Sequence, residues 1–597
     1  SEPAVTLATD ALARVVDALA GGEPRPGQRE MAAAVAEAVA TGTPLIVQAG
    51  TGTGKSLAYL VPAVALGAKV LVATATKALQ DQLATKDAPQ VAAVLGDFGY
   101  AVLKGRQNYV CHQKLDELHR APDLFGGGAR LADVVAWADA SATGEVAELE
   151  DRFDRSVLDR IVTSSDECTG PRCPRVDACR ANEARARADA AQVVIVNQHL
   201  LGADVQASGG VLPEWDVLIV DEAHELEDVM AQALGDEVGP GRIRRVLGAV
   251  TDLLADADDL RREVGEAADR VADALDALDL PDGQPTRRFP DGLASEERLP
   301  GLLTALIERC NTGRARVAAA DGSPETKVRA ERAARAAAGL STVLTRLLDP
   351  QEGDVVWLEG LPGRRRIKVA SLAVAPRLAG YWRERPVVCT SATIPPGLGP
   401  KVGLAVEART VESPFDFRTQ ALFYVARHLP EPRDPQWRAA AAAETRRLVD
   451  AAGGRALLLF TSWSGLDRTL DLAFAEPLPY RLLRQGTLGK QQLVEAFRDD
   501  ESSVLAATRG FWAGLDVPGD ALRLVVIDRI PFPVPTEPLH QARCEAVGRD
   551  AFRMVDVPLA ATHLAQGAGR LIRTRSDRGV VALMDPRLAL RRDGYGR

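Results

Sequence analysis

The residues with the clearest chemical capacity form a glycine-rich run after a short apolar stretch, Ala49-Gly50-Thr51-Gly52-Thr53-Gly54-Lys55-Ser56. When such a loop leads into a helix, its backbone N–H groups, here those of Gly50, Gly52, Thr53 and Gly54, can surround phosphate oxygens. Lys55 can reach the β- and γ-phosphates, and the Ser56 hydroxyl can bind Mg²⁺. Ala49 stands where the strict pattern has its first glycine. The alternative, a Gly-Thr turn that only begins a helix, is less consistent with the Lys-Ser pair, so the run predicts a site for nucleotide phosphates.

An acidic tetrad, Asp221-Glu222-Ala223-His224, follows the apolar run Val217–Val220. A carboxylate at the end of a strand can hold Mg²⁺ while its neighbour orients the attacking water. Alone, such a tetrad would more often be the acidic start of a helix. Together with the phosphate loop it predicts hydrolysis of a nucleoside triphosphate, with Asp221 at the Mg²⁺ ion and Glu222 at the water.

Two arginines near the C-terminus, Arg570 and Arg573, lie within the segment Gln566–Arg573. Their spacing of three would place them on one face of a helix if the segment is helical. Arginines that reach a γ-phosphate from a second domain stabilise the charge that develops in phosphoryl transfer. The alternative is a basic, solvated helix face, but a chain with a phosphate loop needs such arginines.

Seven cysteines are present, and four of them lie between the phosphate loop and the acidic tetrad: Cys111, Cys168, Cys173 and Cys179. Four clustered cysteines in a chain without an export signal favour metal ligation over disulfides. Four thiolates suit either a [4Fe–4S] cluster or a tetrahedral zinc ion, and spacing alone does not decide between them, although the tight Cys-x2-Cys knuckles of zinc ribbons are absent. The other three, Cys310, Cys389 and Cys544, are expected to be packing residues.

The elements that must position these residues alternate between strand and helix patterns. Helical Gln28–Ala40 is followed by strand-like runs at 45–47, 70–74, 193–196, 217–220 and 387–390, with helices starting at Lys55 and Lys77. This order predicts an α/β fold with a doubly wound parallel sheet. After a Pro-rich boundary at 395–400, further strands at 456–460, 504–507, 524–527 and 580–583 predict a second α/β domain.

Two insertions interrupt the first α/β domain. The cysteine-bearing insert is expected at 105–195, and residues 231–369 are expected to form an all-helical insert, with a loop at 281–292 because of its Pro and Gly content. One further strand-like run lies at 355–358. The first domain then comprises 1–104, 196–230 and 370–412, and the second comprises 413–597.

Composition narrows the setting. At 597 residues the chain exceeds what one hydrophobic core supports, so several domains are expected. A net charge of −10 means that nucleic-acid binding must come from a local basic groove. No run approaches the length of a membrane span and the N-terminus lacks an export signal, so we expect a cytoplasmic protein with no membrane partner.

Candidate contacts for nucleic-acid phosphates are Lys104 with Arg106, the stretch 314–335, and the stretch 364–368. Each could equally be a solvated charged face. Trp463, Phe511 and Trp512 could stack on bases or could brace the structure by packing.

Taken together, these segments resemble the superfamily 2 helicases, and in detail the XPD/DinG branch, over nearly the whole chain. The matching segments are Arg25–Gln28 (the adenine-side segment), 72–77 (motif Ia), 390–393 (motif III), 459–463 (motif IV), 508–519 (motif V), 566–573 (motif VI) and the Pro-rich 530–535. The resemblance implies two RecA-like P-loop domains, with an iron–sulfur insert and an arch-like helical insert in the first. Two departures are Gln48, where relatives carry Glu, and Ala513, where motif V often has Glu, so no catalytic role is assigned to either position.

For the sites, the resemblance implies that Gln28 contacts the base, that Asp516 of motif V belongs to the nucleotide site, and that Gln566 of motif VI is catalytic. It favours a [4Fe–4S] cluster over zinc at the four cysteines. The expected cofactors are ATP, Mg²⁺ and this cluster, and the expected activity is 5′–3′ translocation on single-stranded DNA with unwinding of duplexes. Single-stranded and forked DNA are then the expected partners of a monomeric, nucleoid-associated protein that acts in DNA repair or in replication conflicts. Since only about two dozen residues precede Arg25, no N-terminal nuclease domain is expected.

Two other functions are compatible with parts of this pattern. A DEAH tetrad also marks RNA helicases, although the cysteine insert argues against that class. A redox- or metal-sensing DNA-binding protein with a vestigial ATPase is the second alternative. The complete set of Lys55, Asp221, Glu222, Arg570 and Arg573 argues for a working ATPase instead.

Overall fold

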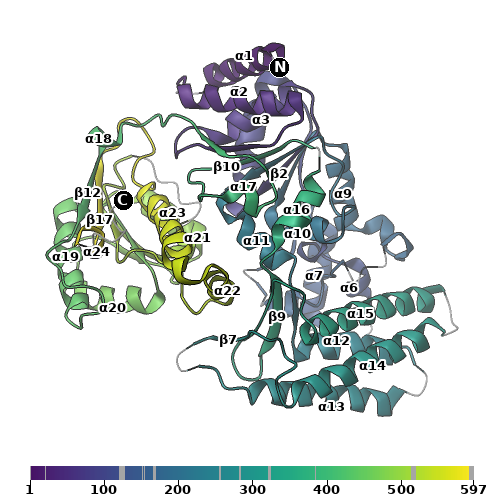
Figure 1. The fold of residues 1–597 in the computed structure, drawn as a ribbon. Helices are drawn as coiled ribbons and strands as arrows, with labels where there is room; N and C mark the ends of the chain where they lie inside the picture. The colour runs from purple at the N-terminus through teal and green to yellow at the C-terminus, as the bar shows by residue number, and fades with distance from the viewer. Residues whose placement is uncertain are drawn as a thin grey trace.

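The computed structural model describes residues 2–590 except 20–21, 120–127, 151, 154, 166–167, 169, 255–256, 282–283, 320–323, 384 and 513–518. Two parallel sheets, each covered by helices, face each other, and two further lobes extend from the first sheet (Figure 1). Within the described ranges, no helix combines the length and the apolar character needed to cross a bilayer.

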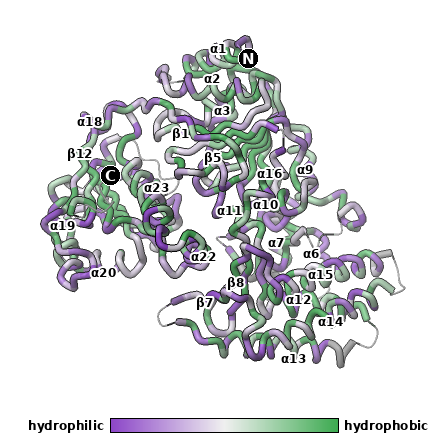
Figure 2. Tube along the Cα trace, viewed as in Figure 1, coloured by the Kyte–Doolittle hydropathy of each residue, from purple (hydrophilic) through white to green (hydrophobic). Residues whose placement is uncertain are grey.

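The first sheet has seven parallel strands in the order β11-β1-β10-β5-β2-β4-β3. Their bounds are β1 Leu45–Gln48, β2 Val70–Thr74, β3 Tyr100–Val102, β4 Val193–Asn197, β5 Val217–Asp221, β10 Val387–Ser391 and β11 Ala408–Thr410. Leu71 and Ala73 pack into a core on one face of this sheet, whereas Val70 and Val72 pack into a core on the other. Both faces are therefore buried, as the apolar strand sequences predict, and Figure 2 shows hydrophobic residues concentrated along these strands.

Helices cover both faces of the first sheet. Those of the chain before the cysteine insert are α1 Glu2–Ala18, α2 Pro26–Thr41, α3 Lys55–Ala65, α4 Lys77–Gln82 and α5 Ala88–Leu95. Those after it are α10 Gln198–Gln206, α11 Leu226–Ala233, α16 Val374–Trp382 and α17 Leu398–Lys401. A π-helical turn, Leu83–Asp87, joins α4 to α5.

The second sheet has six parallel strands in the order β12-β17-β16-β13-β15-β14. Its strands are β12 Ala421–Val425, β13 Ala456–Phe460, β14 Leu482–Arg484, β15 Val504–Thr508, β16 Leu524–Ile527 and β17 Gly579–Leu583. The accompanying helices are α18 Phe417–Gln420, α19 Trp437–Ala452, α20 Trp463–Ala473, α21 Lys490–Asp499, α22 Pro538–Val547, α23 Val557–Ala568 and α24 Arg587–Leu590. The two-domain α/β organisation is confirmed.

The cysteine insert forms a small helical lobe after β3. Its helices are α6 His112–His119, α7 Gly128–Ala140, α8 Arg155–Leu158 and α9 Arg180–Ala190. Leu115, Val134, Leu149 and Ile161 belong to a core of its own. This core is small, so the lobe has little apolar burial with which to stabilise itself.

The second insert is not all-helical, and this part of the sequence-based prediction is wrong. Beside helices α12 Pro240–Thr251, α13 Ala257–Asp276, α14 Leu299–Ala318 and α15 Pro324–Leu348, it contains a four-stranded antiparallel sheet of order β6-β9-β8-β7. The strands are β6 Asp236–Val238, β7 Thr286–Phe289, β8 Asp354–Glu359 and β9 Arg366–Ser371. β7 lies inside the expected loop at 281–292, and β8 is the strand expected at 355–358. In β9, alternate residues Ile367 and Val369 pack onto the helices, so one face of the sheet completes their core.

The two inserts contact each other through charged side chains. Arg332 of α15 lies 3.3 Å from Glu117 of α6, measured from Nη2 to Oε1. Arg335 donates to the backbone oxygen of Cys168 at 3.4 Å, and Arg172 pairs with Glu331. Figure 1 shows α6 and α15 side by side, so the contact joins the lobes away from the sheet that carries both.

Candidate active site

The phosphate loop connects β1 to α3 and is shaped by glycines with positive φ. Gly52 and Gly54 have φ values of 78° and 80°. A Cβ atom on Gly54 would lie 2.3 Å from Gln28 Nε2, and one on Gly52 would lie 2.1 Å from the Phe415 ring. Both positions therefore require glycine for conformation and for space.

Gln28, the expected base contact, lies beside the phosphate loop. Its amide nitrogen donates to the Gly54 carbonyl at 3.1 Å, and Arg25 donates to the Gly52 carbonyl. The Gln28 side chain is almost fully buried. The segment Arg25–Gln28 thus supports the carbonyl side of the loop and leaves its N–H groups for a ligand.

The acidic tetrad begins at the end of β5, next to the phosphate loop. Lys55 Nζ lies 3.3 Å from Glu222 Oε1, and Tyr59 Oη donates to Asp221 Oδ2 at 3.1 Å. Tyr59 follows Ser56 by three residues in α3, so it lies on the same side of that helix. Lys55, Ser56 and the two carboxylates are therefore gathered between β1 and β5, as the two motifs predict.

Burial and charge act differently on the two neighbouring carboxylates. Burial raises the pKa of Asp221 to about 6, although the Lys55 charge opposes the rise and Glu222 adds to it. Burial would also raise the pKa of Glu222, but Lys55 and His224 together hold it well below its usual range. A cation bound beside a buried carboxyl lowers its pKa, because the added positive charge stabilises the ionised form. Asp221, with its raised pKa, would be stabilised in this way. Asp221 and the Ser56 hydroxyl are hard oxygen donors, which fit Mg²⁺.

A hydrogen-bonded chain leads from Glu222 through His224. Glu222 has a φ of 56°, an unusual conformation for a residue with a side chain. Ser391, at the end of β10, donates to Glu222 Oε2 at 3.2 Å, and its hydroxyl lies 2.7 Å from His224 Nδ1. Burial opposes the charge on His224, but hydrogen bonds with Glu222 and Glu225 raise its pKa to about 9.

The chain continues into the second α/β domain. The side-chain amide of Gln566 of α23 lies against the His224 ring, with 2.5 Å between the two Nε2 atoms. Because the raised pKa keeps His224 protonated at neutral pH, the amide oxygen is the atom of Gln566 that can accept from it. The charge of Arg570 contributes to the lowered pKa of Glu222. A Cβ on Gly569 would lie 3.4 Å from Thr51 Cγ2, so the end of α23 lies against the phosphate loop. The structure thus brings Gln566 and Arg570 to the residues of the first domain that would hold a triphosphate.

The two arginines do not share a helical face. α23 ends at Ala568, before Arg570 and Arg573. The sequence Gly567-Ala568-Gly569 explains the early end, since glycine is a poor helix former. The backbone N–H of Arg573 donates to Asp577 Oδ2 at 2.8 Å, which holds this turn. Asp516, the remaining residue expected at the nucleotide, lies outside the described residues.

The sequence reasoning missed three residues of this site. They are Tyr59, Phe415, whose ring lies over the phosphate loop, and Asp87 of the π-helical turn, which is a hydrogen-bond neighbour of Ser56. Burial raises the pKa of Asp87. Helical spacing from Ser56 could have identified Tyr59. No local pattern could have identified Asp87 or Phe415.

The four cysteines of the insert are free thiols, and all are half-buried. Cys111 directly precedes α6, and Cys179 is the N-terminal capping residue of α9. The N–H of Gly170 donates to Cys168 Sγ at 3.4 Å. Burial raises the pKa of Cys111 to about 11, and the neighbouring Cys173 adds to the rise. Helix N-termini and backbone donors favour negative charge on sulfur, whereas burial disfavours it at Cys111. A bound metal would supply the positive charge that a buried thiolate needs.

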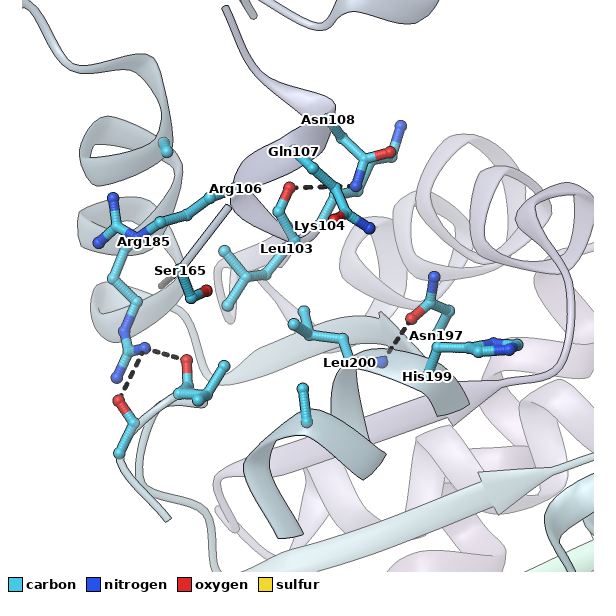
Figure 3. A pocket seen from close by; sticks show the side chains of 15 residues that line it. Leu103, Lys104, Arg106, Gln107, Asn108, Ser165, Arg185, Asn197, His199 and Leu200 are labelled. Carbon is cyan, nitrogen blue, oxygen red and sulfur yellow. Dashed lines mark hydrogen bonds between the residues drawn. The ribbon is translucent and has the colours of Figure 1, made fainter. Parts of the chain in front are cut away.

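A pocket of about 350 Å³, lined by both polar and apolar side chains, lies where the cysteine insert leaves the first sheet. Figure 3 shows Lys104, Arg106 and Asn108 after β3 on one side of it, with Asn197 at the end of β4 and His199 of α10 on the other. Lys104 pairs with Glu145, and both Arg106 Nη atoms donate to Asn182 at 3.1 Å. The pocket thus combines cationic and amide groups at the C-terminal ends of two parallel strands, where ligands of α/β sheets commonly bind.

The other proposed nucleic-acid contacts differ in their surroundings. Arg366 and Lys368 form ion pairs with Glu237 and Glu359. Arg365 is buried and donates to a backbone carbonyl. These three side chains therefore have partners within the insert and offer little charge to DNA. Phe511 and Trp512 are buried in the core of the second domain. Trp463 is 48% exposed, so of these three aromatic rings it is the one available for stacking.

Comparisons with known proteins agree with this geometry. A DEAD/DEAH box helicase family model matches residues 25–140, and a helicase C-terminal domain model matches residues 445–595. ATP-dependent DNA helicase YoaA of Escherichia coli (strain K12) is 35% identical, with 97% of this chain and 94% of that protein aligned. ATP-dependent helicase DinG of Mycobacterium tuberculosis (strain ATCC 25618 / H37Rv) is 36% identical, with 99% and 94% aligned.

A solved structure of Xpd4 from S. tokodaii has a similar fold, with a TM-score of 0.56 at 13% identity, over 94% of this chain and 96% of that one. ATP and Mg²⁺ are the expected cofactors of a DEAD/DEAH box helicase. With relatives of this identity over its whole length, and with a phosphate loop and a DEAH tetrad facing the C-terminal helicase domain, the chain belongs to the DinG/YoaA family of ATP-dependent DNA helicases and is an ATP-hydrolysing enzyme.

Proposed function

We propose that this protein uses ATP hydrolysis to move 5′–3′ along single-stranded DNA as a monomer, and that it separates the strands of forked duplexes in DNA repair and replication. The observation that carries this proposal is the contact between Gln566 and His224, at 2.5 Å. It joins the acidic tetrad of the first domain to α23 of the second. A change at the nucleotide can therefore alter how the two domains meet, which is the step that moves a strand. The direction of movement rests on the family resemblance.

In the proposed reaction, backbone N–H groups of Gly50, Gly52, Thr53 and Gly54 bind phosphate oxygens, and Lys55 contributes positive charge to the β- and γ-phosphates. Ser56 and Asp221 would hold Mg²⁺, which would supply positive charge to offset that of the phosphates. Glu222, with its lowered pKa, stays ionised and orients the attacking water. Arg570 and Arg573 approach from the second domain and stabilise the charge that develops on the γ-phosphate.

Gln28 and Asp516 are assigned to nucleotide binding, with Gln28 at the base. In the present structure Gln28 bonds the Gly54 carbonyl, which is compatible with an amide whose other polar atom remains available to a ligand. Gln566 completes the site. Its contact with His224 would change when Glu222 and His224 move or change charge, and would pass that change to α23 of the second domain.

The cysteine insert is proposed to hold a [4Fe–4S] cluster through Cys111, Cys168, Cys173 and Cys179. Among the described residues, no three of these sulfur atoms lie within 4.8 Å of one another. A single tetrahedral zinc ion would hold them about 3.8 Å apart, given Zn–S bonds of about 2.3 Å. A four-iron cluster binds one thiolate at each iron, so it accommodates sulfur atoms that are further apart. The donor set therefore fits the cluster better than one zinc ion.

The path of the single strand is proposed to pass the pocket between β3 and β4 and to run between the two inserts. Arg106, which donates to the neutral Asn182 amide, would contribute positive charge there, whereas Lys104 already forms an ion pair. The Arg332–Glu117 contact would close the passage on its outer side. The cysteine lobe would then act as a wedge where the duplex divides.

Partial duplexes with one single-stranded tail test this function. With ATP and Mg²⁺, the protein should unwind a duplex with a 5′ DNA tail and a fork, and should leave a duplex with only a 3′ tail intact. Single-stranded DNA should stimulate ATP hydrolysis more than RNA of the same sequence. Unwinding from 3′ tails alone would contradict the proposed direction, and stronger stimulation by RNA would contradict the proposed substrate.

A further inference from the structure

Three potential metal ligands converge outside both the nucleotide site and the cysteine insert. They are His540 and Cys544 of α22, and Asp556 just before α23. His540 Nε2 lies 2.7 Å from Asp556 Oδ1 and 3.4 Å from Cys544 Sγ. One ligand atom from each residue lies within 4.8 Å of the others. The sequence analysis expected only a packing role for Cys544, whereas the structure places its thiol beside an imidazole and a carboxylate.

The backbone explains why these side chains meet. His540 and Cys544 are four residues apart, so they lie on the same face of α22. Asp556 ends the π-helical turn Phe552–Asp556, a rare element that is often found at functional sites. The turn shifts the register just before α23 and brings the Asp556 carboxylate to the imidazole.

The imidazole is oriented for a ligand at Nε2. His540 is 5% exposed, and its Nδ1 atom is buried with no hydrogen-bond partner in the described part of the chain. Both neighbours therefore use the same nitrogen, Nε2. Asp556 and Cys544 are only partly buried, which leaves a route from solvent.

We propose that His540, Cys544 and Asp556 form a zinc site, in which Nε2, Sγ and a carboxylate oxygen bind the ion and water takes the fourth position. A thiolate, an imidazole and a carboxylate are the ligand types that zinc prefers, and three protein ligands with one open position are common. The Nε2–Sγ distance of 3.4 Å is close to the edge of a zinc tetrahedron. Binding displaces the proton on Nε2, which moves to Nδ1, and releases the Cys544 thiol proton. The Nδ1 proton gains no acceptor among the described residues, which weakens zinc binding.

Because of the position of the site, bound zinc would affect how α22 moves relative to α23. α22 touches three parts of the molecule: Leu539 and Ala542 pack into a core of the first domain, Arg543 Nε lies 3.2 Å from Glu227 of α11, and Glu545 pairs with Arg288 of β7 at 2.9 Å. Figure 1 shows α22 between the second sheet and the helical insert. Zinc between α22 and Asp556 would fasten this junction to the start of α23, the helix that carries Gln566.

The site is a reversible one. Without metal, the His540–Asp556 contact already holds the two segments together, so the fold does not depend on the ion. Zinc would restrict movement between α22 and α23 and thereby slow the domain motion that accompanies each ATP cycle. The inference does not depend on the proposed direction or DNA substrate.

Zinc binding to the full-length protein tests the proposal. The anaerobically purified protein, with the metal of its four-cysteine lobe retained, is titrated with Zn²⁺ against a coloured chelator. We expect one added zinc per chain, and at least about tenfold weaker binding in Cys544→Ala and in Asp556→Asn. The control Cys310→Ala removes a thiol from the core of the insert and should leave the affinity unchanged.

Asp556→Asn preserves the shape of the side chain and a hydrogen bond to His540, so it separates loss of a ligand from loss of fold. Co²⁺ in place of Zn²⁺ should give the absorption of a cobalt–thiolate bond in the wild type and in Cys310→Ala, and none in Cys544→Ala. Equal zinc affinity in all four proteins would overturn the proposal. So would added zinc that disappears only when Cys111, Cys168, Cys173 or Cys179 is replaced.

Discussion

The Lys55 ammonium faces both the phosphate loop and Glu222, at 3.3 Å from the carboxylate. Replacement of Lys55 by Ala removes the charge proposed to act on the β- and γ-phosphates. We expect ATP hydrolysis to fall at least about a hundredfold, because phosphoryl transfer depends on such charge. Binding of single-stranded DNA should survive, since other residues form its path. A phosphate-release assay and DNA anisotropy measure the two effects.

Lys69→Ala is the matched control for Lys55→Ala. Lys69 is exposed and directly precedes β2, so it lies at the edge of the first sheet opposite to the edge that carries the phosphate loop. Its ATPase rate should equal that of the wild type. An unchanged rate of ATP hydrolysis in Lys55→Ala would show that the phosphate loop is not the site of hydrolysis.

Arg570 provides a second test at the scale of one side chain. Its charge helps to lower the pKa of Glu222 across the domain interface. If it acts on the transition state, Arg570→Ala should lower kcat by about 10³-fold while nucleotide affinity changes little. The exposed Arg578 is the control for loss of one arginine from this region. Parallel losses of affinity and rate would instead assign Arg570 to ground-state binding.

His224 should make the stability of the site depend on pH. Its pKa is raised from 6.5 to about 9 in the folded protein, by hydrogen bonds to Glu222 and Glu225. The folded state therefore binds more protons than the unfolded state between these values, so this contribution is complete below about pH 6.5 and is lost as pH rises through 9. Its upper limit is on the order of 3 to 4 kcal/mol. The difference in Tm between the wild type and His224→Gln should shrink over this interval, and a difference that grows with pH would contradict the assigned charge.

At the scale of elements, the cysteine lobe should depend on its metal more than the parallel sheets do. Its core is small, and small metal-organised modules often need their metal to fold. We expect about four irons per chain, and Cys173→Ser should lose both iron and colour. That variant should keep DNA-stimulated ATP hydrolysis and lose duplex unwinding. Iron and sulfide are assayed in each variant, together with DNA-stimulated ATP hydrolysis and duplex unwinding. Cys389→Ser controls for loss of a buried thiol.

One tightly bound zinc ion and no sulfide in the wild type would contradict the iron assignment. If Cys173→Ser kept full unwinding, the lobe could not be the wedge.

The sequence predicts some elements better than others, for physical reasons. β2 and β13 are buried on both faces, so their apolar runs stand out, and the structure places both at the expected residues. β7 carries Thr286 and two arginines before Phe289, and only its pairing with β8 makes it a strand. Its strand character comes from distant residues and is absent from the local pattern. The same holds for Asp87 and Phe415, which reach the candidate site through tertiary packing alone.

At the scale of the whole molecule, the contact between the inserts should decide how long a strand remains enclosed. Arg332 and Arg335 of α15 reach α6 and the backbone of Cys168. Such partly exposed ion pairs contribute less than about 1 kcal/mol each, so the double variant Arg332→Ala/Arg335→Ala should fold normally. It should release DNA sooner, and unwinding in a single encounter should fall while ATP hydrolysis stays within about twofold.

Arg261→Ala/Arg262→Ala removes the same charge, and two exposed ion pairs, from α13, outside the basic stretches considered for DNA, and is the matched control. Unwinding lengths on long forks, measured with a trap for free protein, compare the two variants. Equal lengths would show that the strand is not enclosed between the inserts.

The strand order of the first sheet also constrains how this protein is made. β1, which leads into the phosphate loop, pairs only with β10 and β11 within the described sheet. Its nearer partner begins at Val387, so β1 must wait for roughly 340 further residues to be synthesised, which takes about 20 to 70 s at usual rates of translation. Both inserts are complete before that point, because they end before β10. A ribosome that stalls between the inserts and β10 would therefore expose a nascent chain that contains both complete inserts and an unpaired, apolar β1, a segment prone to aggregate.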